Sequence, residues 1–325
     1  MQKLFIRALA VAGVLVTAVA AAIALFVAMQ AASHKNKPAM EDTPGYIFDK
    51  NYVVSLEELS RAKKLAEKLG SKEGDREKQG DVNPADYMTK DFGAGVATLS
   101  YFRYLDAMFA DSPDLPSHLE GVKKLVFEKL PVDKASRLYS LYEKYLTCEL
   151  ELANMLSSKK DPKTPADMIR LLSDAQNFRR EYLGRELADA LFGADIKALE
   201  YAIRRSAIVS EKTLHGREKE ILVKQLTEDM WGDQAGAVES YSLPFNRYLE
   251  KLRMYALDMA ELKTEKEKAA MLKDIRSSCF PPEVVSQLEK IDAEQAKTVR
   301  DADKNPEKGV REPQPPKPGD LEGTN

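Results

Sequence analysis

The sequence predicts an all-α protein, with an N-terminal transmembrane helix followed by an extended multi-helix arm that has small helical subdomains at its ends. Apolar residues recur at helical spacing in one segment after another between residues 55 and 303. No stretch of alternating apolar and polar residues lies between turn signals, so we expect no sheet. The expected divisions are 1–33 (transmembrane anchor), 34–93 (tether, one short helix and flexible linker), 94–160 (first helical subdomain), 161–262 (extended helical region), 263–303 (closing helical subdomain) and 304–325 (disordered tail).

The N-terminal segment indicates an exported protein. Lys3 and Arg7 precede an uncharged, strongly apolar run from Ala8 to Ser33, which is about the length that a helix needs to cross ~30 Å of hydrocarbon. The apolar region of a signal peptide is shorter, roughly 7–15 residues, so we expect an uncleaved anchor. The alanines near the end of the run leave a cleaved signal peptide as the alternative. The basic residues before the run favour an N-terminus inside and the rest of the chain outside.

Export makes a disulfide between Cys148 and Cys279 chemically possible. Two buried free cysteines are the alternative, because the two positions are far apart in the chain. The sequence leaves both states open.

After the run the chain is polar to about residue 52, as expected of a tether, and then becomes helical. Ser55 and Glu58 form a capping box, and Gly70 ends the first helix. The polar stretch 71–86 is expected to be a flexible linker. Further helices are predicted at 96–109, 119–130, 135–156, 165–192, 194–208, 211–230, 234–262, 264–278 and 282–303.

Composition excludes several classes of protein. Lys and Arg total 49 against 52 Asp and Glu, for a net charge of −3, so a dedicated nucleic-acid binder is not expected. There is no phosphate-binding glycine loop, nucleophile elbow or zinc-protease motif. His118 has no evident partner in the sequence, and Glu211, His215 and Glu218 are interpreted as a solvated helix face. We therefore expect no enzyme and assign no catalytic, cofactor or metal residue.

Three stretches carry a resemblance to a known family. The first reads FRREYLGRELADALFGADIKALEYAIRRSAI and runs from Phe178 to Ile208. It resembles the lipase chaperones, also called lipase-specific foldases. The residues that match the family pattern are Arg179, Arg180, Tyr182, Gly184, Glu186, Leu191, Phe192, Gly193 and Tyr201. The segments 104–131 and 268–292 are similar to the early and closing helices of the same family.

The family signature near the first folded helices is altered in this chain. That signature reads Arg-x-x-Phe-Asp-Tyr-x-Leu-x-Ala-x-Gly-Glu. The corresponding residues here are Thr98, Tyr101, Phe102, Arg103, Leu105, Ala107, Phe109 and Ala110. An aromatic residue, the leucine and the alanine remain. We therefore expect a retained scaffold with an altered activating module.

The resemblance implies a membrane-anchored periplasmic steric chaperone that assists the folding of a secreted lipase by wrapping it with helices. It implies a single-pass protein of the inner membrane, with a lipase as client and no cofactor. The alternative is a periplasmic helical adaptor that kept the scaffold and lost foldase activity; a helical enzyme is the third hypothesis. The residues that the resemblance indicates for partner binding are Thr98, Tyr101, Phe102, Arg103, Leu105, Ala107, Arg179, Arg180, Tyr182 and Phe192.

Overall fold

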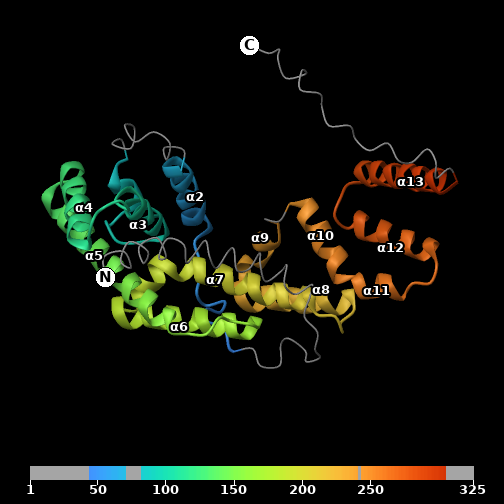
Figure 1. The fold of residues 1–325 in the computed structure, drawn as a ribbon, viewed down its shortest axis with the longest axis horizontal. Coiled ribbons are helices and arrows are strands. Elements are labelled where there is room, and N and C mark those ends of the chain that lie inside the picture. The colour runs from blue at the N-terminus through green and yellow to red at the C-terminus, as the bar shows by residue number, and fades with distance from the viewer. Residues whose placement is uncertain (1–43, 71–81, 241–242, 305–325) are drawn as a thin grey trace, which may run out of the picture. The chain divides into compact units, whose positions relative to one another are not determined.

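The computed structural model describes residues 44–70, 82–240 and 243–304 (Figure 1). Over these residues every regular element is a helix, which confirms the all-α prediction. The chain divides into two compact units, Met1–Tyr241 and Ser242–Asn325. The division falls inside the range 161–262, which the sequence suggests is one region. Each unit is described by itself below.

The predicted transmembrane segment, residues 1–33, lies outside the described residues, as does the tail from residue 305. Among the helices that are described, none combines the length and the apolar character that crossing a bilayer requires. The anchor therefore stays a prediction from sequence.

The first unit is a set of packed helices joined by short connections (Figure 1). Its elements are α2 (Leu56–Gly70), η2 (Pro84–Tyr87), α3 (Val96–Met108), α4 (Leu115–Lys129), α5 (Val132–Ser157), α6 (Pro165–Leu183), α7 (Arg185–Ser210), α8 (Gly216–Trp231), η3 (Gly232–Gln234) and α9 (Ala235–Ser240). Helix α3 packs on α2 and α7, α4 packs on α5, and α6 lies along α7. A common apolar core runs through α2 to α7 and holds the buried aromatic residues of α3 and α5.

Capping residues set where several helices begin, although α4 starts at Leu115 and not at the predicted 119. The Thr164 hydroxyl accepts a hydrogen bond from the amide of Asp167 at 3.1 Å, and the Asp167 carboxylate accepts one from the amide of Thr164. Pro165 then occupies the first turn of α6, where its missing N–H costs nothing. Asp114 caps α4 through the amide of Ser117 in the same way.

The break between α6 and α7 lies at Gly184, and the predicted boundary at 192–194 is wrong. Gly184 has φ +86° and ψ 145°, a conformation that glycine alone adopts easily. Gly193 lies inside α7, where a Cβ would come within 2.2 Å of the Tyr52 hydroxyl oxygen. The first glycine therefore turns the chain, while the second gives room for a close neighbour.

Two other predicted helices have different limits in the structure. Helix α8 begins at Gly216, five residues after the predicted start at 211, because Glu218 caps the amide of His215. The predicted helix 234–262 is interrupted: α9 ends at Ser240, and two shorter helices follow in the second unit. Pro244 stands in the first turn of the next helix, which is the usual place of proline at a helix start.

The segment before α2 differs from the tether predicted from residue 34 to about residue 52. Residues 44–54 form no helix, yet they lie against α7 and η3 through hydrogen bonds of their main chain. We call residues 44–54 the strap. Within the predicted linker, residues 71–81 lie outside the described residues, and residues 84–87 form the short helix η2.

The second unit consists of α10 (Pro244–Met254), α11 (Ala256–Glu261), α12 (Glu265–Ser277) and α13 (Pro282–Lys304). Helix α12 packs on α10 and α13. Its small core contains Met254, Ile275, Cys279 and Val285. An ion pair between Arg276 of α12 and the Asp292 carboxylate of α13 links the last two helices.

Candidate partner-binding site

The ten residues that the sequence indicates for partner binding lie on α3 and around the turn between α6 and α7. The structure brings the two groups together. Arg103 of α3 pairs with Asp195 of α7 at 3.1 Å. The Phe102 ring lies 5.0 Å from the ring of Tyr145, which stacks in turn on Phe192 at 6.2 Å. Both groups therefore belong to one packed region around α5.

The side chains on α3 mostly face inward. Tyr101, Phe102 and Leu105 are fully buried. The Thr98 hydroxyl is also buried: it accepts from the amide of Gly95 at 2.9 Å and donates to the carbonyl of Tyr87 at 2.7 Å. These side chains support the fold of the unit, and in this conformation they are not available to a partner.

Asp106, which the sequence did not single out, lies at the centre of this region. Its carboxylate accepts hydrogen bonds from the hydroxyls of Tyr142 at 2.7 Å and Tyr145 at 2.8 Å. Burial raises the pKa of Asp106 to about 6, although both hydroxyls oppose the shift. The same burial raises the pKa of both tyrosines.

His118 extends this network, so the expectation that it has no partner is wrong. Its Nε2 lies 2.6 Å from the Tyr142 hydroxyl, and its Nδ1 lies 3.0 Å from the carbonyl oxygen of Phe109. Tyr142 has one hydroxyl proton and two possible acceptors, Asp106 and His118 Nε2. A hydrogen bond from Nδ1 to the Phe109 carbonyl leaves Nε2 of a neutral imidazole as an acceptor, so all three contacts are hydrogen bonds only if Asp106 or His118 carries one more proton. Burial raises the pKa of Asp106 and lowers that of His118, so the Asp106 carboxyl group is favoured to hold this proton.

Arg179 of α6 is held by a buried ion pair. Its Nε and Nη2 atoms donate to the two carboxylate oxygens of Glu149 at 2.7 and 2.8 Å, and both side chains are about nine-tenths buried. The guanidinium lies 3.9 Å from the centre of the Phe192 ring. Burial alone would lower the pKa of Arg179, but the pairing with Glu149 raises it, so the arginine stays charged.

Arg180 ties α6 to α7 across the turn at Gly184. It donates to both carboxylate oxygens of Asp189, at 2.7 and 3.2 Å, and Gln176 donates to the same carboxylate. The outer face of the Arg180 guanidinium lies 4.6 Å from the Phe48 ring of the strap. Arg179 and Arg180 therefore both hold helices together.

Of the ten predicted residues, Tyr182 and Ala107 are exposed to solvent, and Arg103 is partly exposed. Tyr182 is 46% exposed and stacks on Phe178. These side chains remain open to a partner in this conformation. The role of all ten in binding stays a prediction.

Sequence reasoning missed three charged residues of α7 that bind the strap. Lys197 donates to the carbonyls of Asp49 and Tyr52, and Glu200 accepts from the amide of Ile47. Arg204 donates to the carbonyls of Pro44 and Gly45 and pairs with Glu200. The sequence shows charged residues at helical spacing, which are normally solvated, so it gives little signal of their burial.

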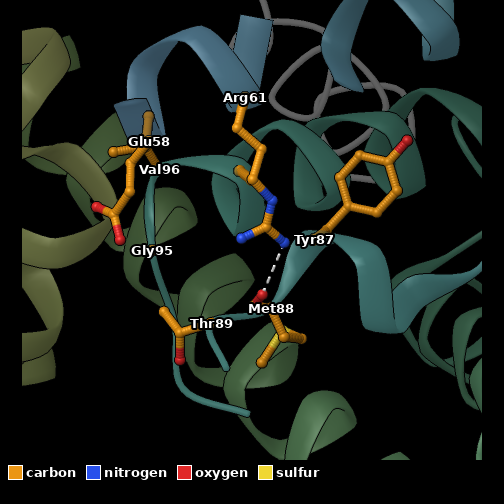
Figure 2. Close-up of a pocket in the computed structure, with 8 residues that line it drawn as sticks. Glu58, Arg61, Tyr87, Met88, Thr89, Gly95 and Val96 are labelled. Atoms are coloured by element: carbon orange, nitrogen blue, oxygen red, sulfur yellow. Dashed lines mark hydrogen bonds between the residues drawn. The ribbon is translucent and has the colours of Figure 1, made fainter. Parts of the chain in front are cut away.

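A small cavity lies in the first unit. The cavity in Figure 2 lies between α2 and the start of α3 and has a volume of about 20 Å³, room for a water molecule. Arg61 crosses it to donate to the carbonyl of Met88. Over the described ranges, no three His, Cys, Asp or Glu side chains cluster as metal ligands do.

Both cysteines are buried and free. Cys148 lies in the first unit and Cys279 in the second. Burial raises the pKa of the Cys148 thiol to about 12, so this thiol is poorly reactive at neutral pH.

The family model described as proteobacterial lipase chaperone protein matches residues 141–301. Over these residues the chain belongs to the lipase chaperone family. The match begins in α5, includes the α6–α7 turn with its two buried arginine pairs, and continues to α13. It confirms the resemblance drawn from sequence. The family is a chaperone family and not a catalytic one, which agrees with the expectation of a non-enzyme. Comparisons with curated proteins and with solved structures gave no match.

Proposed function

We propose that this lipase chaperone is a membrane-anchored, periplasm-facing foldase that assists the folding of a secreted lipase by wrapping it with helices. The observation that carries the proposal is the family match over residues 141–301. It spans helices of both compact units, so the proposed client-binding scaffold includes more than one local motif.

The surface of the helices supports a role in binding another protein. Apolar side chains that stay exposed include Tyr182 and Ile221 in the first unit and Leu243, Phe245 and Leu249 in the second. Phe245 and Leu249 are 59% and 38% exposed and lie one helical turn apart on α10. Such residues suit contact with the apolar surface that an incompletely folded hydrolase presents.

A protein of this kind acts without a bound nucleotide. A client hydrolase that stalls in a compact inactive state is separated from its active state by a barrier. A chaperone that binds the conversion state more tightly than the stalled state lowers that barrier. Because the barrier is lowered by differential binding alone, the described helices need no catalytic side chain.

The proposed anchor, residues 1–33, gives the chaperone a fixed place at the inner membrane. The uncharged run from Ala8 to Ser33 supports it. Tethering would confine encounters with the client to the membrane surface and raise their effective concentration. It would also retain the chaperone when the folded lipase leaves the cell.

The proposal is tested by refolding. A secreted lipase from the same cell is denatured and diluted into buffer with the full chain in detergent, with an unrelated helical protein, or alone. We expect active lipase only with the chain present, together with a complex that can be isolated. A lipase that regains equal activity in all three samples would exclude the foldase function.

The altered signature favours a second candidate function, an envelope adaptor without foldase activity. Thr98 stands where the family has arginine, and its hydroxyl is used inside the fold by Gly95 and Tyr87. An adaptor would capture the lipase on a column and leave the refolding yield unchanged. Reactivation of the captured lipase would instead show that the departures at 98–110 are tolerated.

A further inference from the structure

The strap is held on α7 mainly through its main chain. Five residues of α7 form the surface beneath it, which we call the docking face: Asp189, Gly193, Lys197, Glu200 and Arg204. They follow one another at intervals of three or four and so lie on one side of the helix. The main-chain atoms that this face and Gln234 bind are Pro44 O, Gly45 O, Ile47 N, Asp49 O, Tyr52 O and Val54 O.

The charges of the docking face are buried, which is unusual for a helix that only needs an apolar neighbour. Lys197 is 1% exposed, Glu200 is fully buried and Arg204 is 5% exposed. A buried charge is costly unless hydrogen bonds compensate it. Here the compensation comes from peptide groups of the strap as well as from the Glu200–Arg204 pair. The face is therefore built to bind the peptide groups of a segment that is not helical.

Two aromatic side chains add selectivity. Phe48 is buried under the Arg180 guanidinium, and the Tyr52 hydroxyl donates to the carbonyl of Asp189 at 2.8 Å. Both rings lie beside Gly193, where a Cβ would meet Tyr52 at 2.2 Å and Phe48 at 3.2 Å. The glycine of the Leu-Phe-Gly sequence therefore leaves room for two rings that are four residues apart.

The strap is also the part of the first unit that can leave without unfolding a helix. It has no helical hydrogen bonds of its own, and α2 begins only at Leu56.

We propose that the docking face of α7 is a binding site for a non-helical segment of an incompletely folded client polypeptide, and that the strap occupies this site until the client displaces it. The occupant is identified by its chemistry: free peptide groups and two aromatic residues four positions apart, which a turn from Asp49 to Tyr52 brings to 4.2 Å between ring centres in the strap. A folded protein keeps its peptide groups and aromatic rings occupied, whereas an incompletely folded chain leaves some of them free. The inference rests on the proposed chaperone function and adds to it the site and the class of ligand.

The experiment measures binding of a fluorescein-labelled peptide of residues 44–54 to the full chain. In the wild type, the covalently attached strap competes at high effective concentration. In the full-length double variant Phe48→Ala/Tyr52→Ala the competitor is weakened. We expect this variant to bind the peptide about tenfold or more tightly than the wild type. A peptide with alanine at the positions of Phe48 and Tyr52 should bind weakly to both proteins.

A third change blocks the site. Adding Gly193→Ala to the double variant should abolish the gain in affinity, because the new methyl group fills the space for the aromatic rings. The matched control is Gly236→Ala in α9, where a Cβ meets nothing within 4 Å, and it should leave the gain intact. Equal peptide binding by the wild type and the double variant, or a gain that survives Gly193→Ala, would overturn the proposal.

A second measurement does not depend on the double variant. Gly193→Ala alone should expel Tyr52 and release the strap, which is read as faster tryptic cleavage after the exposed Lys50. Gly236→Ala should cleave at the wild-type rate. An unchanged rate for Gly193→Ala would contradict the exchangeable strap.

Binding of a client to the docking face is tested with a reduced, carboxymethylated polypeptide that stays unfolded. It should displace the labelled peptide from the double variant, whereas the same polypeptide in its native form should not. Failure to displace would limit the site to the strap and overturn the proposal. If the polypeptide displaces the labelled peptide but this protein reactivates no lipase, the foldase function is contradicted and the binding site is supported.

Discussion

At the residue scale, the adjacent Arg179 and Arg180 each hold α6 to a different helix. Arg179 reaches Glu149 of α5, and Arg180 reaches Asp189 of α7. Each guanidinium binds its carboxylate with two donors, the geometry at which arginine surpasses lysine. Because adjacent residues of a helix point to different sides, the two side chains fix α6 to two different neighbours.

Loss of the Arg179 side chain should destabilise the first unit strongly. Arg179→Met leaves the buried Glu149 carboxylate without its partner, and we expect a loss of about 3–5 kcal/mol in the free energy of unfolding. Urea unfolding followed by the fluorescence of Trp231, the sole tryptophan, reports on this unit.

The control for this change is Arg170→Met, which removes an exposed ion pair with Asp167 on the same helix. It should cost less than about 1 kcal/mol. Equal losses in the two variants would mean that the Arg179 pair is not the buried support that its geometry indicates.

The buried network around Asp106 predicts that the free energy of unfolding depends on pH. The pKa of Asp106 is about 6 in the folded chain and 3.8 ordinarily, so folding favours the protonated acid. This contribution to stability is present below about pH 4 and is lost as the pH rises through 6, with a total of about 3 kcal/mol. Asp106→Asn should remove it, so the wild type should lose stability relative to the variant between pH 4 and pH 7.

His118 acts in the opposite direction, because burial lowers its pKa. Its neutral form favours folding above its ordinary pKa, and that contribution is lost as the pH falls. The wild type is therefore compared with Asp106→Asn, because both chains retain His118. The free energy of unfolding of each is measured at three pH values. A difference between the wild type and Asp106→Asn that does not vary with pH would exclude the titration of Asp106.

At the element scale, the turn at Gly184 sets the packing of α6 along α7. An alanine at φ +86° is strained, and we expect Gly184→Ala to cost about 1–3 kcal/mol. Gly236→Ala, inside α9, should be neutral or stabilising by up to about 1 kcal/mol, because alanine favours a helix interior. Thermal unfolding of the full chain compares the two. A Gly184→Ala chain as stable as the wild type would show that the turn tolerates a side chain.

The helices themselves were largely predictable, because capping and periodicity are local. Thr164 with Pro165, and Thr264 with Glu267, begin helices where the sequence suggests. The choice between Gly184 and Gly193 as the break was not predictable. Gly193 is required by Tyr52, which lies far away in the chain, so no local pattern distinguishes the two glycines.

Contacts between residues far apart in the chain also explain which parts of the candidate site could not be predicted. The strap has no periodicity, and its partners on α7 lie about 150 positions later in the chain. His118 and Tyr142 meet because α4 packs on α5, which the spacing of either helix alone does not reveal. Residues on α3 that resemble the family signature were predictable as apolar, but not as fully buried.

At the scale of the whole molecule, membership of the lipase chaperone family and the absence of strands among the described residues agree with a helical protein that binds a partner. The buried polar contacts described above stabilise the individual units. The exposed apolar residues, among them Tyr182 of α6 and Phe245 and Leu249 of α10, are open to a partner, and the docking face of α7 is the further site that we propose.

The proposed foldase function is tested by measuring the yield of active lipase as a function of chain concentration. A denatured lipase from the same cell is diluted with increasing amounts of the full chain in detergent. We predict that the yield rises from near zero and saturates close to an equimolar ratio, as expected for a stoichiometric complex. A yield that stays at the level of spontaneous refolding at every ratio, with the chain folded, would contradict the account.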